Sequence, residues 1–243
     1  MIGRLDVHAQ RLHDCPMSTG QIAIRPDLVA AQTAAWHQVT SPGASWTGAE
    51  RAAIAATALA ALDDPDPLPP WLSPKTAGRA MPGDGVVPDI VSAAVYRIAR
   101  HAATLTVDWY ESQLEQGIDA FAYVEMVGIV CAVAAVDGFY RAAGLPRPPL
   151  PPAVGGDAHG RHPDVEPATL NWVPVTVPAD GRAAVVQGLS AAPGDDDTIW
   201  RLAAAQYIPA DEMGEMRWSR GTLARSDMEV VAARLSASRE CFY

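Results

Sequence analysis

The residues of this chain that are best suited to chemistry lie in its last stretch, Thr222 to Tyr243. Glu229 falls in the first turns of an apolar-faced run that predicts a helix, and Cys241 follows twelve residues later. A carboxylate can relay a proton, and an ionised thiol is a nucleophile and a redox group. Glu229 and Cys241 are therefore the candidate catalytic residues.

The spacing of this pair sets a geometric condition. Twelve residues of straight helix advance about 18 Å, so only a bend or break before Cys241 would bring its thiol near Glu229. The chain offers Ser236-Ala237-Ser238 as the place for that break. Two plainer interpretations stay open, namely that Cys241 is a small buried residue near a chain end and that Glu229 completes a capping box with Ser226.

Whether Glu229 transfers protons or only caps the helix depends on how deeply its carboxyl group is buried. If its carboxyl group is buried against the apolar face of Val230 and Val231, its pKa rises and it can accept a proton near neutral pH. Other carboxylates have structural interpretations. Asp137 and Arg141, four residues apart, predict an ion pair on one helix face, and Glu125 suits a buried partner for a basic residue elsewhere.

No residues of the sequence have the spacing of a metal site, and no cofactor is expected. The run Asp195 to Asp197 predicts the start of a helix, where acids complement the helix dipole without a metal. His159 and His162 lack partners at ligand spacing and predict a solvent-facing loop. Cys131, in the middle of an apolar run, predicts a core position.

Composition narrows the functional classes. The net charge is −10, with 28 acidic against 18 basic residues and no basic block, which argues against nucleic-acid or anionic-membrane partners. Three widely spaced cysteines, Cys15, Cys131 and Cys241, do not form a disulfide framework and suit a reducing cytosol. No signal peptide is recognisable, and the apolar run from Val124 to Val136 is too short to span a bilayer. We expect a soluble, cytoplasmic protein.

The elements that would position the candidate residues are helices. Alanine-rich runs with apolar residues at helical spacing predict an all-α fold of about eight helices with no convincing strand pair. The expected helices cover residues 26–41, 47–62 (opened by a capping box at Thr47 and Glu50), 88–104, 106–116, 120–143, 179–192 and 197–207, followed by the final helix from residue 222. The helix over 120–143 is apolar on most sides and should lie centrally.

The rest of the chain predicts one all-helical domain over residues 20–243. Residues 1–19 have no period and are expected to be a poorly ordered extension, or else Met17 is the true start. Asp63 to Pro74 is a proline-rich rigid connector, and Leu145 to Pro178 is a long non-helical excursion that is functional or covers another surface. The stretch from Trp46 resembles the final helix weakly, which leaves a degenerate internal repeat open.

The final stretch resembles the active-site helix of the alkylhydroperoxidase D-like, or carboxymuconolactone decarboxylase-like, superfamily. That helix typically has Glu-Leu-apolar-Ala, then Cys-x-x-Cys, then a His. Met228-Glu229-Val230-Val231-Ala232-Ala233 and Glu240-Cys241-Phe242-Tyr243 match its first part in register. Tyr123 to Val130 and Asp137 to Pro146 resemble the preceding helix of the family, so the likeness reaches from about residue 22 to the end. The alkylhydroperoxidase-related subgroup that includes selenoproteins is the most similar.

The resemblance implies a helical bundle that oligomerises, a hydroperoxide substrate, and a thiol reductant or redox partner protein. In the family's peroxidases the second motif position attacks the peroxide, the first Cys resolves it, and the Glu relays protons. Here that assigns Cys241 as the resolving thiol and Glu229 as the proton relay. The second Cys and the His would follow Tyr243, so we expect a domain that lacks its C-terminal end, with selenocysteine encoded next.

Two functional classes follow from the resemblance. The first is a thiol- or selenol-dependent hydroperoxide reductase, in which the printed chain is inactive or impaired because Cys241 has no partner for disulfide closure. The second is a non-catalytic helical binding or assembly protein of the same superfamily. Thiol titration and peroxide consumption distinguish them.

Overall fold

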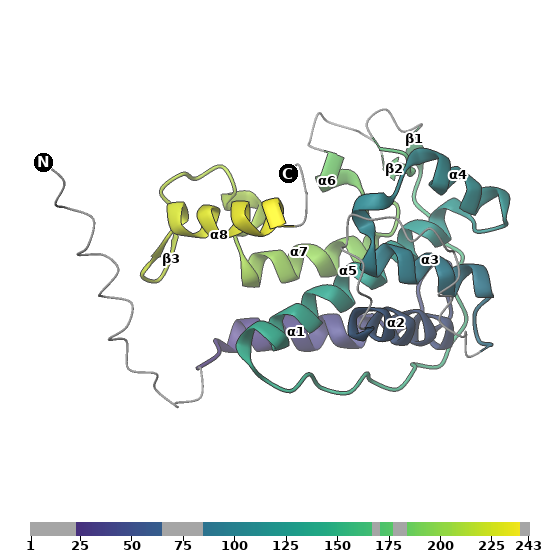
Figure 1. Ribbon diagram of the computed structural model, residues 1–243, viewed down its shortest axis with the longest axis horizontal. Coiled ribbons are helices and arrows are strands. Elements are labelled where there is room, and N and C mark those ends of the chain that lie inside the picture. Colours follow the sequence, from purple (N-terminus) through teal and green to yellow (C-terminus); the bar gives the residue numbers. More distant parts are fainter. Residues whose placement is uncertain (1–22, 65–84, 167–170, 177–183, 239–243) are drawn as a thin grey trace, which may run out of the picture.

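The computed structural model describes residues 23–64, 85–166, 171–176 and 184–238. Within these ranges the chain is built from eight α-helices, with only four two-residue strands, which confirms the predicted all-α class (Figure 1). The helices are α1 (Pro26–Gln38), α2 (Gly48–Asp63), α3 (Asp89–Arg100), α4 (Val107–Glu115), α5 (Ala120–Ala143), α6 (Ala184–Gln187), α7 (Pro193–Gln206) and α8 (Arg225–Ser238).

Local capping signals explain where the best-predicted helices begin and end. Thr47 Oγ1 accepts a hydrogen bond from the Glu50 amide, and the Glu50 carboxylate accepts one from the Thr47 amide, so the predicted capping box of α2 is confirmed. Asp119 caps α5, and Gly144, with a φ of 65°, ends it in the left-handed conformation that favours glycine. These bounds follow directly from the sequence.

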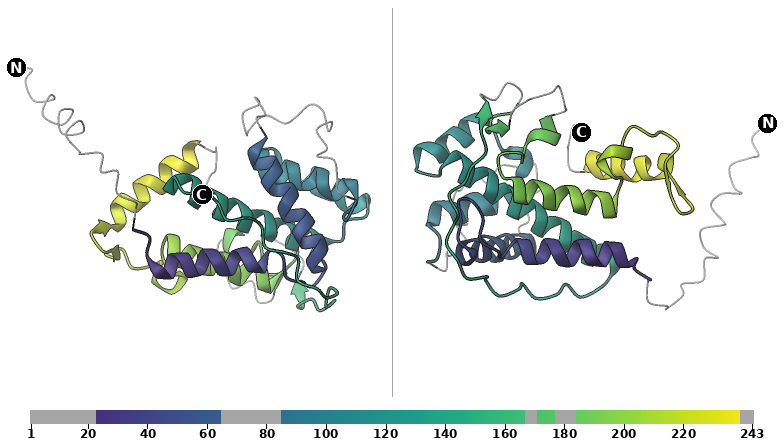
Figure 2. Two further views of the ribbon diagram at one scale, coloured as in Figure 1. Left: turned by 90° about the horizontal axis from the view of Figure 1, so that it is seen from below. Right: turned by 180° about the vertical axis from the view of Figure 1, so that it is seen from behind.

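The core lies around α5, which packs against α1, α2, α3 and α7. Figures 1 and 2 show these helices gathered around α5, with α8 at the periphery beside the C-terminal end of α7. The fully buried core side chains of α5 and of the helices packed against it are mostly alanine, valine and isoleucine, which lets the helices approach closely. They include Ile54, Ala58, Val95, Met126, Ile129, Val133 and Val136. The predicted central position of this helix is confirmed.

By length and composition alone, α5 is a helix that could cross a membrane, which the shorter apolar run considered in the sequence did not suggest. The structure confirms the predicted helix over 120–143, which has 24 residues, and buries 67% of its most apolar window inside the protein. Burial of this kind is what the core helix of a globular bundle shows.

Three helices depart from their predicted bounds. α7 begins at Pro193 rather than at Asp197, because proline at the first turn of a helix costs no hydrogen bond. α6 covers only Ala184–Gln187 of the expected 179–192 helix, whose start lies outside the described residues. At residue 101 the predicted 88–104 helix passes into a short 3₁₀ turn, Ala102–Thr104.

Two short antiparallel hairpins correct the expectation of no strand pair. β1 (Val165–Glu166) pairs with β2 (Val175–Thr176), and β3 (Ser219–Arg220) pairs with β4 (Leu223–Ala224). Each strand has two residues, too few to show an alternating pattern in the sequence. Gly221, with a φ of 61°, makes the tight turn between β3 and β4. That hairpin leads straight into α8.

The proline-rich excursion after α5 covers another part of the fold, as one of the two sequence interpretations proposed. Trp36 Nε1 on α1 donates a hydrogen bond of 2.8 Å to the carbonyl oxygen of Pro149. The Val154 amide donates to Thr40, and the His159 amide donates to Gly43. In Figure 1 this segment runs along the outside of α1 toward the start of α2. It therefore fixes the loop between these two helices.

Several predictions fall outside the described residues, namely the extension over 1–19, most of the connector from Asp63 to Pro74, and Cys241. The suggested repeat relates two helices in different settings. α2 packs against α3 and α5 in the core, whereas the main contact of α8 is with β4. Glu50 caps its helix and Glu229 does not, so the likeness does not extend to the function of the glutamate.

Candidate functional site

Glu229 lies on the side of α8 that faces the body of the protein. α8 begins at Arg225, so Ser226 lies inside the first turn and the proposed capping box with Ser226 is not formed. Instead, the Glu229 carboxylate accepts a hydrogen bond of 3.0 Å from Arg225 Nε, one turn earlier. It also accepts a hydrogen bond from the hydroxyl of Tyr207, just after α7. Glu229 thus joins the ends of two helices.

The environment of Glu229 differs from the buried one considered in the sequence. Its side chain is 44% exposed, and Val230 and Val231 are themselves well exposed, so they do not bury the carboxylate. The hydrogen bond from Tyr207 and, after it, the hydrogen bond and charge of Arg225 outweigh partial desolvation and hold the pKa of Glu229 below its ordinary value. The pKa of Tyr207 is raised by desolvation and by the same carboxylate. At neutral pH Glu229 is therefore ionised, and it is a weaker base than an ordinary glutamate.

Glu229 and Tyr207 line a cavity of about 700 Å³ between α8 and the end of α7. Most of the wall is apolar, and the polar groups are gathered where α8 approaches Tyr207. The lining residues are Gln206, Tyr207, Leu223, Met228, Glu229, Val231, Ala232, Ala233, Leu235 and Ser236. An apolar recess with a few convergent polar groups is the usual form of a small-molecule site.

Cys241 lies outside the described residues, so its distance from Glu229 is not defined. α8 itself continues without a break from Arg225 to Ser238. The Ser236-Ala237-Ser238 segment suggested as a break is the end of the helix instead.

A second group of charged side chains is buried in the centre of the bundle. Arg51 of α2 is fully buried, and its Nη1 lies 2.5 Å from Glu125 Oε1 on α5. Its Nη2 lies 2.7 Å from Asp195 Oδ1, in the first turn of α7. The second oxygen of Glu125 accepts a hydrogen bond from the Ser45 amide. This confirms the prediction that Glu125 is a buried partner for a basic residue elsewhere.

Two glycines make room for this cluster. A Cβ atom on Gly43 would lie 1.9 Å from Glu125 Oε1, and one on Gly128 would lie 2.5 Å from Asp195 Cβ. Both distances are shorter than a carbon contact allows. Gly128 therefore permits α7 to approach α5, and Gly43 permits the loop before α2 to close over Glu125.

The cluster holds one cation and two carboxylates, so it has an excess of negative charge when all three are ionised. Desolvation, together with the charge of Glu125, raises the pKa of Asp195 despite the opposing effect of Arg51. Desolvation alone would lower the pKa of Arg51, but Asp195 and Glu125 outweigh it and raise that pKa. Arg51 stays charged, and the raised pKa makes Asp195 easier to protonate in the folded chain than in the unfolded chain.

Cys131 is exposed, which corrects the prediction of a core position. It lies on a stripe of α5, with half-buried Val127 and Ala134 and exposed Gly138, that the helices around α5 leave partly open. Desolvation, with a contribution from the charge of Asp195, nevertheless raises the pKa of Cys131 to about 11. Accessibility together with desolvation indicates a thiol in a recess, which is protonated and unreactive at neutral pH.

Other predicted polar groups have structural roles. Arg141 Nε lies 2.6 Å from Asp137 Oδ2, which confirms the predicted ion pair, and Arg147 also contacts Asp137. His159 is exposed, and the exposed ring of His162 stacks on Phe121 at 4.3 Å between centroids. Among the described residues, no group of three or more His, Cys, Asp or Glu side chains is placed to hold a metal ion.

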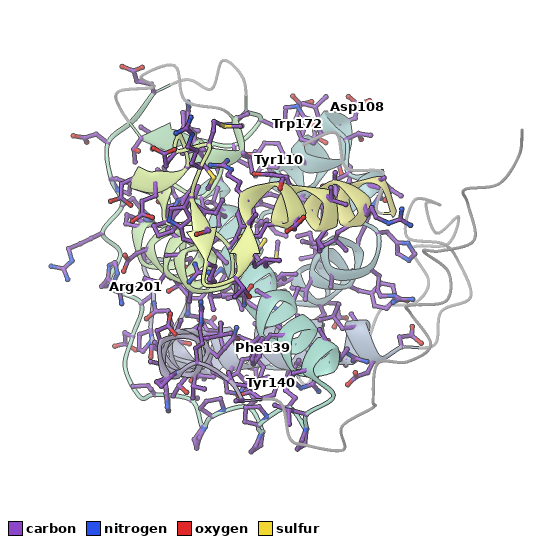
Figure 3. All side chains as sticks on the ribbon, turned by 90° about the vertical axis from the view of Figure 1, so that its left-hand side faces the viewer. Asp108, Tyr110, Phe139, Tyr140, Trp172 and Arg201 are labelled. Carbon is purple, nitrogen blue, oxygen red and sulfur yellow. The ribbon has the colours of Figure 1, made fainter. Side chains whose placement is uncertain are left out.

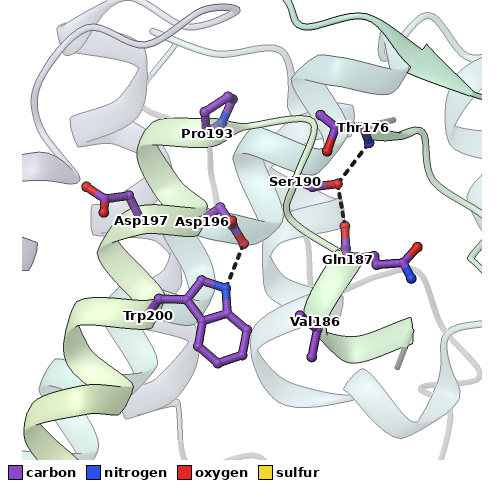
Figure 4. Close-up of a pocket in the computed structure, with 8 residues that line it drawn as sticks. All are labelled: Thr176, Val186, Gln187, Ser190, Pro193, Asp196, Asp197 and Trp200. Carbon is purple, nitrogen blue, oxygen red and sulfur yellow. Dashed lines mark hydrogen bonds between the residues drawn. The ribbon is translucent and has the colours of Figure 1, made fainter. Parts of the chain in front are cut away.

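A smaller cavity of about 380 Å³ lies between α6 and the start of α7 (Figure 4). On one wall Trp200 Nε1 donates to Asp196 Oδ1, and on the other the Ser190 hydroxyl accepts from the Thr176 amide and donates to the Gln187 carbonyl oxygen. These contacts tie the β1–β2 hairpin to α6. The cavity contains none of the residues predicted to carry chemistry.

Comparisons with family models, with curated proteins and with solved structures find no match to this chain.

The sequence alone did not single out Arg51, Asp195 and Tyr207 as residues of these sites. Arg51 had a usable signal, because it is a single cation within an alanine-rich apolar helix whose other residues predict burial. Asp195 was assigned with its neighbours to the helix dipole, and nothing in the run Asp195 to Asp197 singles it out. Tyr207 had no signal, since its contact with Glu229 depends on how α8 folds back on α7.

Proposed function

We propose that this chain serves a thiol- or selenol-dependent hydroperoxide reductase, with Glu229 as the proton relay and Cys241 as the resolving thiol. The proposal rests on the family resemblance of the final stretch, and the observation that carries it is the position of Glu229. The carboxylate lines a largely apolar cavity of about 700 Å³ and is oriented by Tyr207 and Arg225. Such a recess suits an organic hydroperoxide.

The chemistry needs a second redox group three residues after Cys241, at the second position of the Cys-x-x-Cys motif. Its thiolate or selenolate attacks the terminal peroxide oxygen, the O–O bond breaks, and the alkoxide leaves with a proton as an alcohol. The Cys241 thiolate then attacks the oxidised sulfur or selenium and releases water. A dithiol reductant supplies the two electrons that restore the pair.

Glu229 has two tasks in this sequence. As a carboxylate it accepts the proton of the attacking thiol or selenol and returns it to the leaving alkoxide. The hydrogen bonds from Tyr207 and Arg225 fix its orientation and keep it ionised at neutral pH. A carboxylate with a lowered pKa is a weaker base, so the redox group must itself ionise readily, as a selenol does.

The test is peroxide consumption with a dithiol reductant. We compare two proteins, the printed chain and an extended version. The extension adds a Cys or selenocysteine three residues after Cys241, followed by a His. We expect turnover by the extended form and little or none by the printed chain. In the extended form, Glu229→Gln should lower kcat by about 10²-fold or more, whereas Glu111→Gln, at an exposed site on α4, should leave it unchanged.

A second function, a helical binding or assembly protein, is favoured by a different observation. α8 exposes Val230, Val231 and Leu235, and its main contact is with the short strand that precedes it. An apolar helix face left open in this way is typical of an interaction surface. An extended form that folds but consumes no peroxide would favour this function over the first.

A further inference from the structure

We propose that the outward face of α8 binds the same face of a second copy of this chain, with the two helices antiparallel about a two-fold axis that passes between Val230 and Val231. This inference identifies a second copy of the chain as the partner for the exposed face of α8, the surface that favours the proposed binding function. It stands whether or not the protein reduces hydroperoxides, because the pairing uses exposed side chains of α8 and does not use the Glu229 carboxylate; Val231 also borders the cavity that Glu229 lines.

The two sides of α8 are clearly divided by burial. Residues three and four apart lie on one face of a helix. The face toward the body consists of buried or half-buried Arg225, Met228, Glu229, Ala232 and Ser236. The opposite face consists of exposed Asp227, Val230, Val231 and Arg234. Val230 is 60% exposed and Val231 is 68% exposed, so the centre of the outward face is apolar.

The charges of this face are arranged symmetrically about its apolar centre. Asp227 stands three residues before Val230, and Arg234 stands three residues after Val231. Neither forms an ion pair with any residue that the structure describes. When two α8 helices lie antiparallel about that centre, Asp227 of each copy faces Arg234 of the other. The dimer therefore has two such ion pairs. A parallel pair would instead place like charges opposite one another. The face is thus self-complementary in one orientation.

Charge also favours a second copy over other partners. The whole chain has a net charge of −10, so two copies repel unless they meet at a neutral surface. α8 supplies one, since Arg225 and Arg234 balance Asp227 and Glu229. A neutral face gives an anionic membrane no basic cluster to attract it. A two-fold contact uses the same patch on both partners, as this arrangement does.

The β3–β4 hairpin enlarges the surface beside α8. Met216, just before β3, is 75% exposed, and Leu223 of β4 is 46% exposed. Five of the eleven large apolar side chains that are well exposed in the described chain lie between residues 216 and 235. Figure 3, which views the molecule from this side, shows α8 and the hairpin together at the front. A single helix pair is small for a stable interface, so we expect a micromolar dimer.

Charge-swap variants test the pairing by sedimentation equilibrium over a range of protein concentrations. Asp227→Arg places arginine opposite arginine, and Arg234→Asp places aspartate opposite aspartate. Each should raise the dimer dissociation constant about 10-fold or more. The double variant, Asp227→Arg with Arg234→Asp, restores both pairs and should dimerise within about 3-fold of the original chain. Asp197→Arg, on an exposed part of α7, is the matched control and should change nothing.

The outcomes are distinct. A monomer at every concentration overturns the proposal, and so does a dimer that the single charge reversals leave intact. A double variant that stays as weak as the single variants also overturns it, because additive charge effects do not require the two residues to meet. Circular dichroism of each variant shows whether it is folded. An extended chain that dimerises as predicted but consumes no peroxide would overturn the proposed function and leave this inference standing.

Discussion

At the scale of the residue, the buried group of Arg51, Glu125 and Asp195 connects three helices that are far apart in the sequence. Each carboxylate reaches the same guanidinium, and Arg51 also donates a hydrogen bond of 3.2 Å to the carbonyl oxygen of Gln38. A buried charge that loses its partner costs more free energy than an exposed one. The cluster therefore specifies how α2, α5 and α7 fit together.

Arg51→Met tests this role. The variant leaves two carboxylates buried without a cation, and we expect it to lower the free energy of unfolding by about 3–5 kcal/mol. Arg201→Met is the matched control, because Arg201 pairs with Asp197 on the surface and should change stability by no more than about 0.5 kcal/mol. Urea unfolding measures both. Equal effects of the two substitutions would contradict the role assigned to Arg51.

The excess charge of the cluster predicts a pH dependence. The folded pKa of Asp195 is raised above its ordinary value of 3.8, so the folded chain binds this proton more tightly than the unfolded chain. Stability from this group is therefore highest at low pH and is lost as the pH rises through the raised folded pKa. Asp195→Asn cannot titrate. We expect the substitution to cost more stability at pH 5 than at pH 8, and the opposite order would contradict the raised pKa.

At the scale of the element, the close approach of α5 and α7 depends on Gly128. Gly128→Ala would place its Cβ 2.5 Å from Asp195 Cβ, and the shift this forces should cost about 1–3 kcal/mol despite the higher helix propensity of alanine. In the same helix, a Cβ on exposed Gly138 meets nothing, so Gly138→Ala should be neutral or stabilise by up to about 1 kcal/mol. Thermal unfolding compares the pair.

Helix bounds could be predicted from the sequence where local capping residues set them, and features that depend on tertiary contacts could not. The bounds of α2 and α5 were predictable because Thr47, Glu50, Asp119 and Gly144 are local caps. The exposure of Cys131 was not predictable, since an apolar run does not show which side of a helix its neighbours leave open. The body-facing position of Glu229 was also beyond the sequence, because Tyr207 reaches it only after the β3–β4 hairpin turns α8 back on α7.

At the scale of the whole molecule, a closely packed bundle and a peripheral helix have different roles. α1, α2, α3, α5 and α7 form the bundle around the buried cluster, while α8 lies at one end of it (Figure 1). One side of α8 presents Glu229 to a cavity, and the other presents the apolar surface centred on Val230 and Val231. Val231 belongs to both surfaces, so pairing through α8 would border the cavity in which the proposed chemistry takes place.

Under the proposed function, Cys241, and not the exposed Cys131, takes part in peroxide reduction. Cys131 has a pKa of about 11, so only about one molecule in ten thousand carries its thiolate at pH 7. The most direct measurement is peptide mass spectrometry of the extended chain after one equivalent of hydroperoxide at pH 7. We predict a bond between Cys241 and the group three residues later, with Cys131 still reduced. Oxidation of Cys131 with Cys241 left as a free thiol would contradict the account.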